Sequence, residues 1–265
     1  MNISAWLDHA IKQLREIGVD SARLDAELIL ANTLRKNRTY LHAHPEDDID
    51  PRRVDIANAR LRLRLEHVPL AYILGYRDFY GRRFTVSPQV LVPRPESEAI
   101  IELLKELDVS GKLLDIGTGS GCLGITAKLE IPGLNVILSD ISQPALRVAR
   151  QNAEKFQADV ALIKSNLLRA VPGKFDIIIA NLPYVDRSWQ RSPETNHEPA
   201  LALFAKDEGL ALIYQLIDQL PVHLNPGALI FLEADPRQHG AIIAYAGSRQ
   251  LQHKLTRGFI VVLQA

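Results

Sequence analysis

The sequence predicts an α/β protein with a mostly parallel β-sheet, preceded by a helical domain and a β-hairpin. From residue 96 onward, short apolar segments typical of strands alternate with segments of helical periodicity. This order implies a parallel sheet with helices on both faces. Before residue 68 the apolar residues follow the helical period. We therefore expect a helical domain over residues 1–68, a β-hairpin connector over residues 69–95 and an α/β domain over residues 96–265.

The first domain is expected to contain at least three helices. The first begins at Ser4 as N-cap and stops at Gly18, and its apolar residues recur at helical intervals: Leu7, Ala10, Ile11, Leu14 and Ile17. The second spans residues 21–34, with an inward face made of Leu24, Leu28 and Ala31. The third opens at the Asp-Pro pair 50–51, an N-cap followed by proline at the first helical position. It continues through the Arg-Leu alternation of residues 60–65, which lies in a neighbourhood of good helix formers.

The later elements follow from turn residues and apolar runs. Aromatic and β-branched residues interrupted by Gly and Pro predict a hairpin that turns near Tyr80 and Gly81. Strands are expected at residues 112–115, 135–139, 160–163, 175–180, 228–233 and 259–263. Helices are expected at residues 97–108, 122–130, 142–156 and 208–220. In such sheets ligands bind outside the carboxyl ends of the strands, so the site is expected there.

Composition excludes several classes of protein. The chain has 265 residues, of which 47% are hydrophobic and 23% charged, which excludes global disorder. Lys and Arg number 31, as do Asp and Glu, so we expect no bulk electrostatic attraction to nucleic acid. One cysteine excludes an intramolecular disulfide framework, and the histidines lack the spacing of metal ligands. The charged N-terminus and the absence of long apolar runs predict a soluble cytoplasmic protein without a metal.

A glycine-rich loop follows the first strand of the predicted sheet. Residues 114–121 read Leu-Asp-Ile-Gly-Thr-Gly-Ser-Gly and lead into a helix. Glycine lets the backbone turn tightly and lets a ligand approach without a Cβ in the way. Asp140 ends the next strand, where a carboxylate can accept hydrogen bonds from both ribose hydroxyls of a nucleoside. The pattern predicts a nucleoside-binding site.

Two kinds of cofactor are compatible with this loop. Residues 119–124 match the G-x-G-x-x-G pattern of dinucleotide-binding proteins, so an NAD-dependent dehydrogenase is one alternative. Asp115 counts against it, because its carboxylate would repel a pyrophosphate. The same carboxylate would attract the positively charged amino-acid part of S-adenosylmethionine. The end of the fourth strand also favours S-adenosylmethionine.

The fourth strand ends in Asn181-Leu182-Pro183-Tyr184. The NH2 group of an amide or exocyclic amine is a poor nucleophile because its lone pair is delocalised. Two acceptors aimed at its hydrogens would orient the nitrogen toward a methyl donor. Asn181 Oδ1 and the carbonyl of Leu182 are candidates, with Pro183 favouring an extended backbone before it. Tyr184 offers a flat apolar wall for a planar group.

At these residues the chain resembles the class I S-adenosylmethionine-dependent methyltransferases, which have a Rossmann-like fold. More closely it resembles the HemK/PrmC-type family, which methylates the glutamine in the Gly-Gly-Gln motif of peptide-chain release factors. The Asn-Pro-Pro-Tyr site of that family corresponds to residues 181–184. Further segments match its patterns: residues 69–75, 92–98, 198–203 and 207–210. Residues 92–98 contain Pro-Arg-Pro-Glu-Ser-Glu, which resembles the family's Pro-Arg-Pro-Glu-Thr-Glu box.

The resemblance implies methyl transfer from S-adenosylmethionine to the N5 nitrogen of a glutamine side chain. Asn181 and Tyr184 would be catalytic, and the substrate would be bound by Asn181, Leu182, Pro183 and Tyr184. The cofactor would be bound by Gly117, Thr118, Gly119, Ser120, Gly121, Asp140, Asn166, Leu167 and Asn181. The helical domain would recognise a release factor as the protein partner. The enzyme would be a monomer that does not bind nucleic acid directly.

Two positions depart from the family pattern. Leu182 replaces the first proline of the tetrapeptide, so the carbonyl remains but φ is no longer locked. Asn166 stands where relatives usually carry an acid near the adenine, so its oxygen accepts with reduced strength.

Two further functions remain open at the level of sequence. The first is an N6-adenine or guanine-N2 methyltransferase that acts on nucleic acid, which the zero net charge disfavours. The second is a non-catalytic S-adenosylmethionine-binding module, which would require the Asn181 site to have decayed. Residues 185–206 form a long segment that contains Trp189, and we expect it to act as a substrate-gripping flap.

Overall fold

The computed structural model describes residues 1–265, and the chain forms two compact units. The first unit comprises Met1–Gly75 together with Ser192–His197. The second comprises Tyr76–Arg191 and Glu198–Ala265. None of the helices combines the length and the apolar character that a membrane crossing requires.

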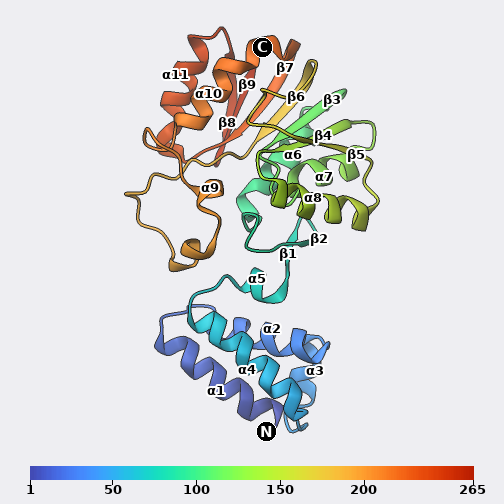
Figure 1. Ribbon diagram of the computed structural model, residues 1–265, viewed down its shortest axis with the longest axis vertical. Helices are drawn as coiled ribbons and strands as arrows, with labels where there is room; N and C mark the ends of the chain where they lie inside the picture. Colours follow the sequence, from blue (N-terminus) through green and yellow to red (C-terminus); the bar gives the residue numbers. More distant parts are fainter. The chain divides into compact units, whose positions relative to one another are not determined.

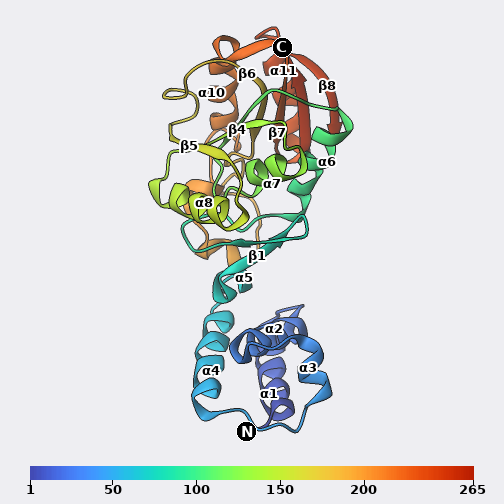
Figure 2. The ribbon, with the colours of Figure 1, turned by 90° about the vertical axis from the view of Figure 1, so that its right-hand side faces the viewer.

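The first unit is a bundle of helices (Figure 2). Its helices are α1 (Ile3–Glu16), α2 (Ala22–Leu34), α3 (Arg38–Ala43), α4 (Pro51–Leu65) and α5 (Leu70–Leu74). Its core is made of fully buried side chains that include Ile3, Trp6, Leu14, Ile29, Leu30 and Leu41. The expected start of α4 is confirmed, because the Asp50 side chain accepts hydrogen bonds from the N–H groups of Arg52 and Arg53. Sequence reasoning missed the short helices α3 and α5.

Three expectations for the first two helices are wrong. Asn2, not Ser4, caps α1, because Asn2 Oδ1 accepts from the Ala5 N–H at 2.9 Å. Ile17 and Leu24 were expected to face inward but are 36% and 41% exposed. The buried face of α2 instead includes Asp25, whose charge has a partner elsewhere in the fold, and a hydrophobic pattern does not reveal such a face.

A buried ion-pair network holds the first unit together at Arg64 of α4. Arg64 Nε donates to Asp25 Oδ2 at 2.6 Å, and Nη2 donates to Glu194 Oε1 at 2.5 Å. Arg64 and Asp25 are almost completely buried. Glu194 belongs to the 3-10 helix η2 (Pro193–His197), so this network fixes a segment 130 residues away in sequence. His197 adds a contact between its Nε2 and the Glu66 carbonyl at 2.8 Å.

The second unit begins with the expected hairpin. Strands β1 (Tyr76–Phe79) and β2 (Arg82–Thr85) pair antiparallel, with Phe79 opposite Arg82, so the turn at Tyr80 and Gly81 is confirmed. The preceding residues 70–74 were expected to belong to a strand-rich connector but form α5.

A sheet of seven strands forms the centre of the second unit (Figure 1). Its strands are β3 (Lys112–Ile116), β4 (Asn135–Asp140), β5 (Val160–Lys164), β6 (Phe175–Ala180), β7 (Leu224–Glu233), β8 (Gln252–Arg257) and β9 (Ile260–Gln264). Their order is β5-β4-β3-β6-β7-β9-β8. All neighbours from β5 to β7 are parallel, and β9 pairs antiparallel with both β7 and β8. The predicted mostly parallel sheet is therefore confirmed.

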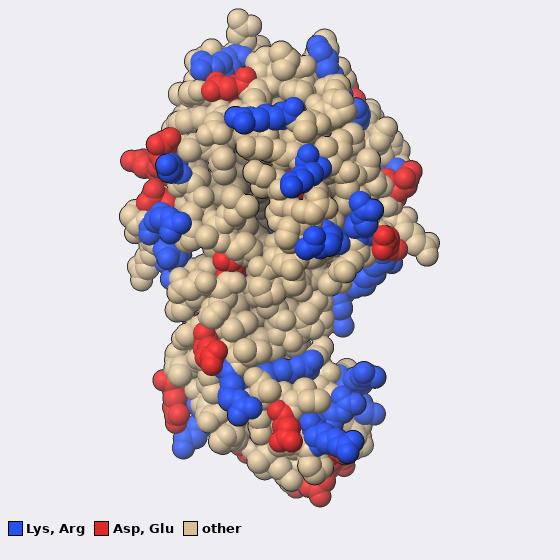
Figure 3. Space-filling model, viewed as in Figure 1, with Lys and Arg blue, Asp and Glu red and all other residues tan.

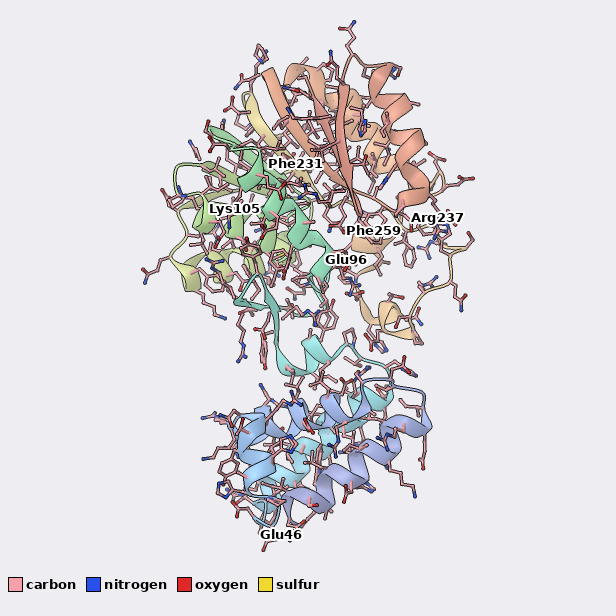
Figure 4. The ribbon with its side chains drawn as sticks, turned by 180° about the vertical axis from the view of Figure 1, so that it is seen from behind. Glu46, Glu96, Lys105, Phe231, Arg237 and Phe259 are labelled. Atoms are coloured by element: carbon pink, nitrogen blue, oxygen red, sulfur yellow. The ribbon has the colours of Figure 1, made fainter.

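Helices cover both faces of this sheet (Figure 1). One face packs against α10 (Ala211–Gln219) and α11 (His239–Gly247). The other packs against α6 (Glu98–Glu106), α7 (Cys122–Glu130) and α8 (Gln143–Phe156). Phe231 of β7, labelled in Figure 4, is fully buried in this second layer. Sequence reasoning missed α11, β8 and the short helix α9 (Ala200–Leu203).

The Arg64 network gives a prediction for stability. Arg64→Met removes the charge that both Asp25 and Glu194 face, and it leaves Asp25 buried without a cation. Breaking such a buried pair on one side costs roughly 3–5 kcal/mol. Urea unfolding followed by Trp6 fluorescence, in a Trp189→Phe background that leaves Trp6 as the only tryptophan, measures the change. The control is Arg257→Met, because the pair of Arg257 with Glu106 is exposed and its loss should change little. Equal stability of the two variants would contradict the prediction.

Candidate active site

The register of three adjacent strands brings the predicted site residues to one edge of the sheet. Ile116 at the end of β3 lies opposite Ser139 of β4 on one side and Ala180 of β6 on the other. The strands are parallel, so the residues that follow them emerge at the same level. This places the glycine loop after β3, Asp140 of β4 and Asn181 after β6 side by side.

A pocket of the second unit lies at this edge, with an empty volume of about 1140 Å³, part of it open to solvent. Most of the predicted site residues line it: Gly117, Thr118, Gly119, Ser120, Asp140, Asn166, Leu167, Asn181, Leu182 and Pro183. Gly121 and Tyr184 are not among the lining residues. The pocket also contains Gln89–Leu91, Pro93 and Arg94, which the segment after the hairpin contributes.

The glycine loop adopts backbone conformations that favour glycine. Gly117, Gly119 and Gly121 have φ values of +69°, +54° and +81°. The N–H groups of Gly117 and Thr118 both donate to the Ser139 carbonyl, at 2.9 and 3.0 Å, which ties the loop to β4. Gly121 has a packing role, because a Cβ there would lie 2.7 Å from Ile125 Cδ1. The loop is therefore rigidly held while Gly117 and Gly119 face the pocket.

Asp140 is buried and its carboxylate is fixed by the backbone. Oδ2 accepts from the Gly119 N–H at 3.0 Å, and Oδ1 accepts from the Ser142 N–H at 2.8 Å. Burial raises the pKa of Asp140, and these backbone hydrogen bonds oppose that rise. A carboxylate accepts about four hydrogen bonds, so each oxygen retains a lone pair for a ligand in the pocket.

Asp115 lies beneath the loop as a buried acid. Its Oδ2 accepts from Thr118 Oγ1 at 2.6 Å and from the Gly124 N–H at 3.0 Å. Burial raises the pKa of Asp115 to about 6, because these two bonds only partly offset the loss of hydration. The ionised Asp115 carboxylate is therefore only partly compensated by the protein and would attract a cation in the pocket.

Two acceptors at the end of β6 have no donor within the protein. Asn181 uses its Nδ2 to donate to Ser97 Oγ at 3.2 Å, and no protein group donates to its Oδ1. No protein group donates to the Leu182 carbonyl either, and the Leu182 N–H makes no hydrogen bond. The Leu182 side chain is buried, and its Cδ2 would lie 3.1 Å from a Cβ added at Gly117. Both residues line the pocket, so both oxygens remain available to accept from a ligand there.

Tyr184 takes a position that sequence reasoning did not foresee. Its hydroxyl donates to Glu233 Oε1 at 3.2 Å, and burial raises its pKa. Glu233, the last residue of β7, is 1% exposed and also accepts from Ser97 Oγ at 2.5 Å. The signal for Glu233 was available in the sequence: an acid ends an apolar strand at the same edge as Asn181. The adjacency of β7 to β6, however, is a tertiary fact.

Residues 92–94, which include the start of the Pro-Arg-Pro segment (residues 93–95), are hydrogen-bonded to Glu198 of the long loop after β6. Arg94 Nη2 donates to Glu198 Oε2 at 2.5 Å, and the Val92 N–H donates to Glu198 Oε1 at 3.0 Å. Glu198 is buried, so its charge depends on these donors. The two segments that the sequence matched separately to one family therefore meet in space.

The base of the loop after β6 is closed by a second set of contacts. Val185 forms a bridge with Phe204, and Gln238 Nε2 donates to the Tyr184 and Glu208 carbonyls at 2.9 and 2.7 Å. Arg237, labelled in Figure 4, lies over the ring of Trp189 at 4.1 Å. The segment is thus held by specific contacts at both ends.

The single cysteine is not an activated nucleophile. Burial raises the pKa of the Cys122 thiol to about 12, so it is protonated at neutral pH and is a poor nucleophile. No group of three or more His, Cys, Asp or Glu side chains is arranged to hold a metal ion.

Comparison with known proteins agrees with this geometry. Residues 5–75 match the PrmC N-terminal domain model, and residues 95–198 match the methyltransferase small domain model. The release factor glutamine methyltransferase of Koribacter versatilis is 40% identical over 253 residues, which cover 89% of each chain. That of Deinococcus radiodurans is 36% identical, covering 92% of this chain and 90% of its own. The chain belongs to the release factor glutamine methyltransferase family.

Membership of this family confirms the predicted resemblance and the predicted class of enzyme. The fold is that of the class I methyltransferases: a T. thermophilus 16S rRNA N2 G1207 methyltransferase, solved with AdoMet and guanosine, superposes with a TM-score of 0.53 at 20% identity. It covers 72% of this chain and 49% of that one. S-adenosylmethionine is the methyl donor of this class, so the NAD-dependent dehydrogenase alternative is wrong.

The raised pKa of Asp115 predicts how stability depends on pH. The Asp115 carboxyl titrates near pH 4 in the unfolded chain and near pH 6 in the folded chain, so the folded state binds its proton more tightly. The buried charge therefore costs stability above pH 6, and this cost disappears as the pH falls below about 4. Asp115→Asn removes the titration. Its free energy of unfolding minus that of the wild type should be roughly 2–3 kcal/mol larger at about pH 8 than at about pH 4.

Urea unfolding of both proteins at the two pH values measures this difference. The exposed Asp159→Asn serves as the matched control and should show a difference that varies little with pH. A difference for Asp115→Asn that is independent of pH would contradict the assignment.

Proposed function

We propose that this protein transfers a methyl group from S-adenosylmethionine to the N5 nitrogen of the glutamine in the Gly-Gly-Gln motif of a peptide-chain release factor. One observation carries the proposal. Asn181 Oδ1 and the Leu182 carbonyl, two acceptors without a protein donor, lie beside the glycine loop and Asp140. The names of the relatives that the chain matches over about nine-tenths of its length support the same substrate.

The residues of the pocket fit S-adenosylmethionine. A side chain at Gly117 would approach Leu182 and narrow the pocket, so the glycine keeps space for a ligand. Asp140 would accept from the ribose hydroxyls, and the loop from Gly117 to Ser120 would surround the amino-acid part near the Asp115 charge. Asn166 and Leu167, which follow β5 and line the pocket, would contact the adenine. Bound S-adenosylmethionine would supply an electrophilic methyl group on a sulfonium sulfur.

The protein's contribution to the reaction is to orient a weak nucleophile. The two hydrogens of the glutamine NH2 would be donated to Asn181 Oδ1 and to the Leu182 carbonyl. This arrangement would turn the nitrogen lone pair toward the methyl group, and positioning of this kind accounts for most of the catalysis of such a displacement. The methylated amide nitrogen becomes acidic and can lose its proton to water. No side chain of the pocket therefore needs to act as a general base before transfer.

Tyr184 would support the site through its contact with Glu233. The sequence predicted that the Tyr184 ring is a flat apolar wall for the substrate, and a ring that acts only in this way would tolerate Tyr184→Phe. The hydroxyl bond to Glu233 now argues for a measurable effect of that variant. The ring and hydroxyl roles are separated by comparing the turnover of Tyr184→Phe with that of Tyr184→Ala.

The helical unit would recognise the release factor, and the enzyme would act as a monomer without contact to nucleic acid. On the face of the second unit that Figure 3 shows, Lys and Arg side chains are scattered and are interspersed with Asp and Glu. A nucleic-acid substrate would favour a continuous basic surface. Because release factors act on ribosomes, the proposed function assigns the enzyme to the cytoplasm.

The role of Asp140 is tested by cofactor binding. Asp140→Ala removes charge-assisted hydrogen bonds and should weaken S-adenosylmethionine binding by roughly 1–3 kcal/mol. Isothermal titration calorimetry measures this, with the exposed Asp159→Ala as control. Unchanged affinity in Asp140→Ala would contradict the assignment of this carboxylate.

The substrate is tested by mass spectrometry of a release factor after incubation with enzyme and S-adenosylmethionine. One added methyl group on the glutamine of the Gly-Gly-Gln peptide is expected. Asn181→Ala should nearly abolish turnover, because it removes the side-chain acceptor. Leu182→Pro should keep or modestly raise kcat, because the carbonyl remains and the ring fixes φ. Methylation of DNA or RNA with none of the release factor would favour the nucleic-acid alternative.

A further inference from the structure

The buried carboxylate of Glu233 is connected to the substrate acceptor by a short chain of hydrogen bonds. Glu233 Oε2 accepts from Ser97 Oγ at 2.5 Å, and Ser97 Oγ in turn accepts from Asn181 Nδ2 at 3.2 Å. Glu233 Oε1 accepts from the Tyr184 hydroxyl at 3.2 Å. Ser97 and Asn181 line the pocket, whereas Glu233 does not. Glu233 therefore acts on the site only through its neighbours.

The direction of this chain follows from the chemistry of its members. An ionised carboxylate can only accept, so the single hydrogen of Ser97 must point to Glu233. The Ser97 oxygen can then only accept from Asn181, and it requires the NH2 end of the amide to face it. The oxygen of Asn181 is left for the pocket. An asparagine amide can otherwise be flipped at little cost, since its two ends are nearly the same size.

We infer that Glu233 is a positioning residue that fixes, through Ser97, which end of the Asn181 amide faces the substrate. The inference rests on the function proposed above. Its physical basis is that a side chain at position 233 that can only accept fixes which atom donates in each hydrogen bond from Asn181 through Ser97 to Glu233. A residue that could both donate and accept would permit the amide to flip, and a flipped Asn181 would present a donor to an NH2 group that itself donates.

The charge state of Glu233 is part of this argument. Burial raises its pKa, the hydrogen bonds from Ser97 and Tyr184 and the nearby Asn181 amide oppose the rise, and the negative charge of Glu96 adds to it. Glu96 belongs to the 3-10 helix η1 (Pro95–Ser97), which immediately precedes α6 (Figure 4). Cys122 of α7 also faces Glu233, and Arg94 and Glu96 act on Tyr184. A protonated Glu233 could donate to Ser97, so kcat should rise with pH as Glu233 ionises.

The first experiment measures steady-state kinetics of Glu233→Gln with the full-length enzyme and a release factor. The glutamine has nearly the same shape but can donate, so kcat should fall about tenfold or more. The KM for the release factor and the Kd for S-adenosylmethionine should change by less than about threefold, since Glu233 does not line the pocket. The acid-side rise of kcat with pH should be absent in the variant. Wild-type kcat in Glu233→Gln would overturn the inference.

Ser97 variants keep the test decisive if Glu233→Gln is unstable. Ser97→Ala interrupts the chain and should lower kcat to a similar extent, and Ser97→Thr, which keeps the hydroxyl, should recover most of it. Equal kcat for the Ala and Thr variants would overturn the inference. The control is Asp176→Asn, at the opposite end of β6 from Asn181, where the carboxylate accepts from the Lys112 N–H and from Asn225. Its kcat should remain that of the wild type.

A spectroscopic measurement separates this inference from the proposed function. The side-chain NH2 signals of Asn181, assigned by their loss in Asn181→Asp, should be protected from solvent exchange in the wild type and lose that protection in Glu233→Gln. This readout needs no substrate. Unchanged protection in Glu233→Gln would refute the positioning role, even if release factor is methylated. Failure of the wild type to methylate any release factor would refute the proposed function, while the NMR result would still decide the role of Glu233.

Discussion

The parallel pairing of β3 with both β4 and β6 is the constraint on which the site depends. The backbone hydrogen bonds of these three strands align Ile116, Ser139 and Ala180 at one level. Each strand then ends in a different kind of group: a glycine loop, a carboxylate and an amide. None of these groups would be a site alone. They become one because the carboxyl ends of parallel strands share an edge.

Three acidic residues lie in or beneath this edge, and each accepts hydrogen bonds from a different set of donors. Asp140 is fixed by backbone N–H groups and retains lone pairs for a ligand. Asp115 accepts from Thr118 of its own loop and from the Gly124 N–H of α7, and its charge remains unfavourable for stability. Glu233 faces only side-chain donors, all of which belong to the tetrapeptide or to the Pro-Arg-Pro segment. A buried carboxylate requires donors, and the donors that each acid receives decide what it can do.

The long loop after β6 contributes residues to both compact units. Near its start Val185 pairs with Phe204, and near its end Glu198 accepts from Arg94 and the Val92 N–H. Its middle, Ser192–His197, belongs to the first unit, where Glu194 accepts from buried Arg64. A segment that sequence reasoning treated as a flap is therefore fixed by ion pairs at two places.

The sequence by itself determined the class of fold and most of the chemistry. The glycine loop, Asp140 and Asn181 each follow an apolar strand, and local spacing was sufficient to place them at one edge because parallel strands leave few alternatives. Caps such as Asp50 and stops such as Gly18 were readable because they act on neighbouring backbone groups. The tertiary structure alone decided which distant groups meet: Glu233 with Ser97 and Tyr184, Glu198 with Arg94, and Arg64 with Asp25 and Glu194. A hydrophobic pattern shows which side chains are apolar. It does not show which buried charged residue forms an ion pair with a residue more than 30 positions away in the sequence. For that reason the inward face of α2, with Asp25, and the position of Tyr184 could not be read from the sequence.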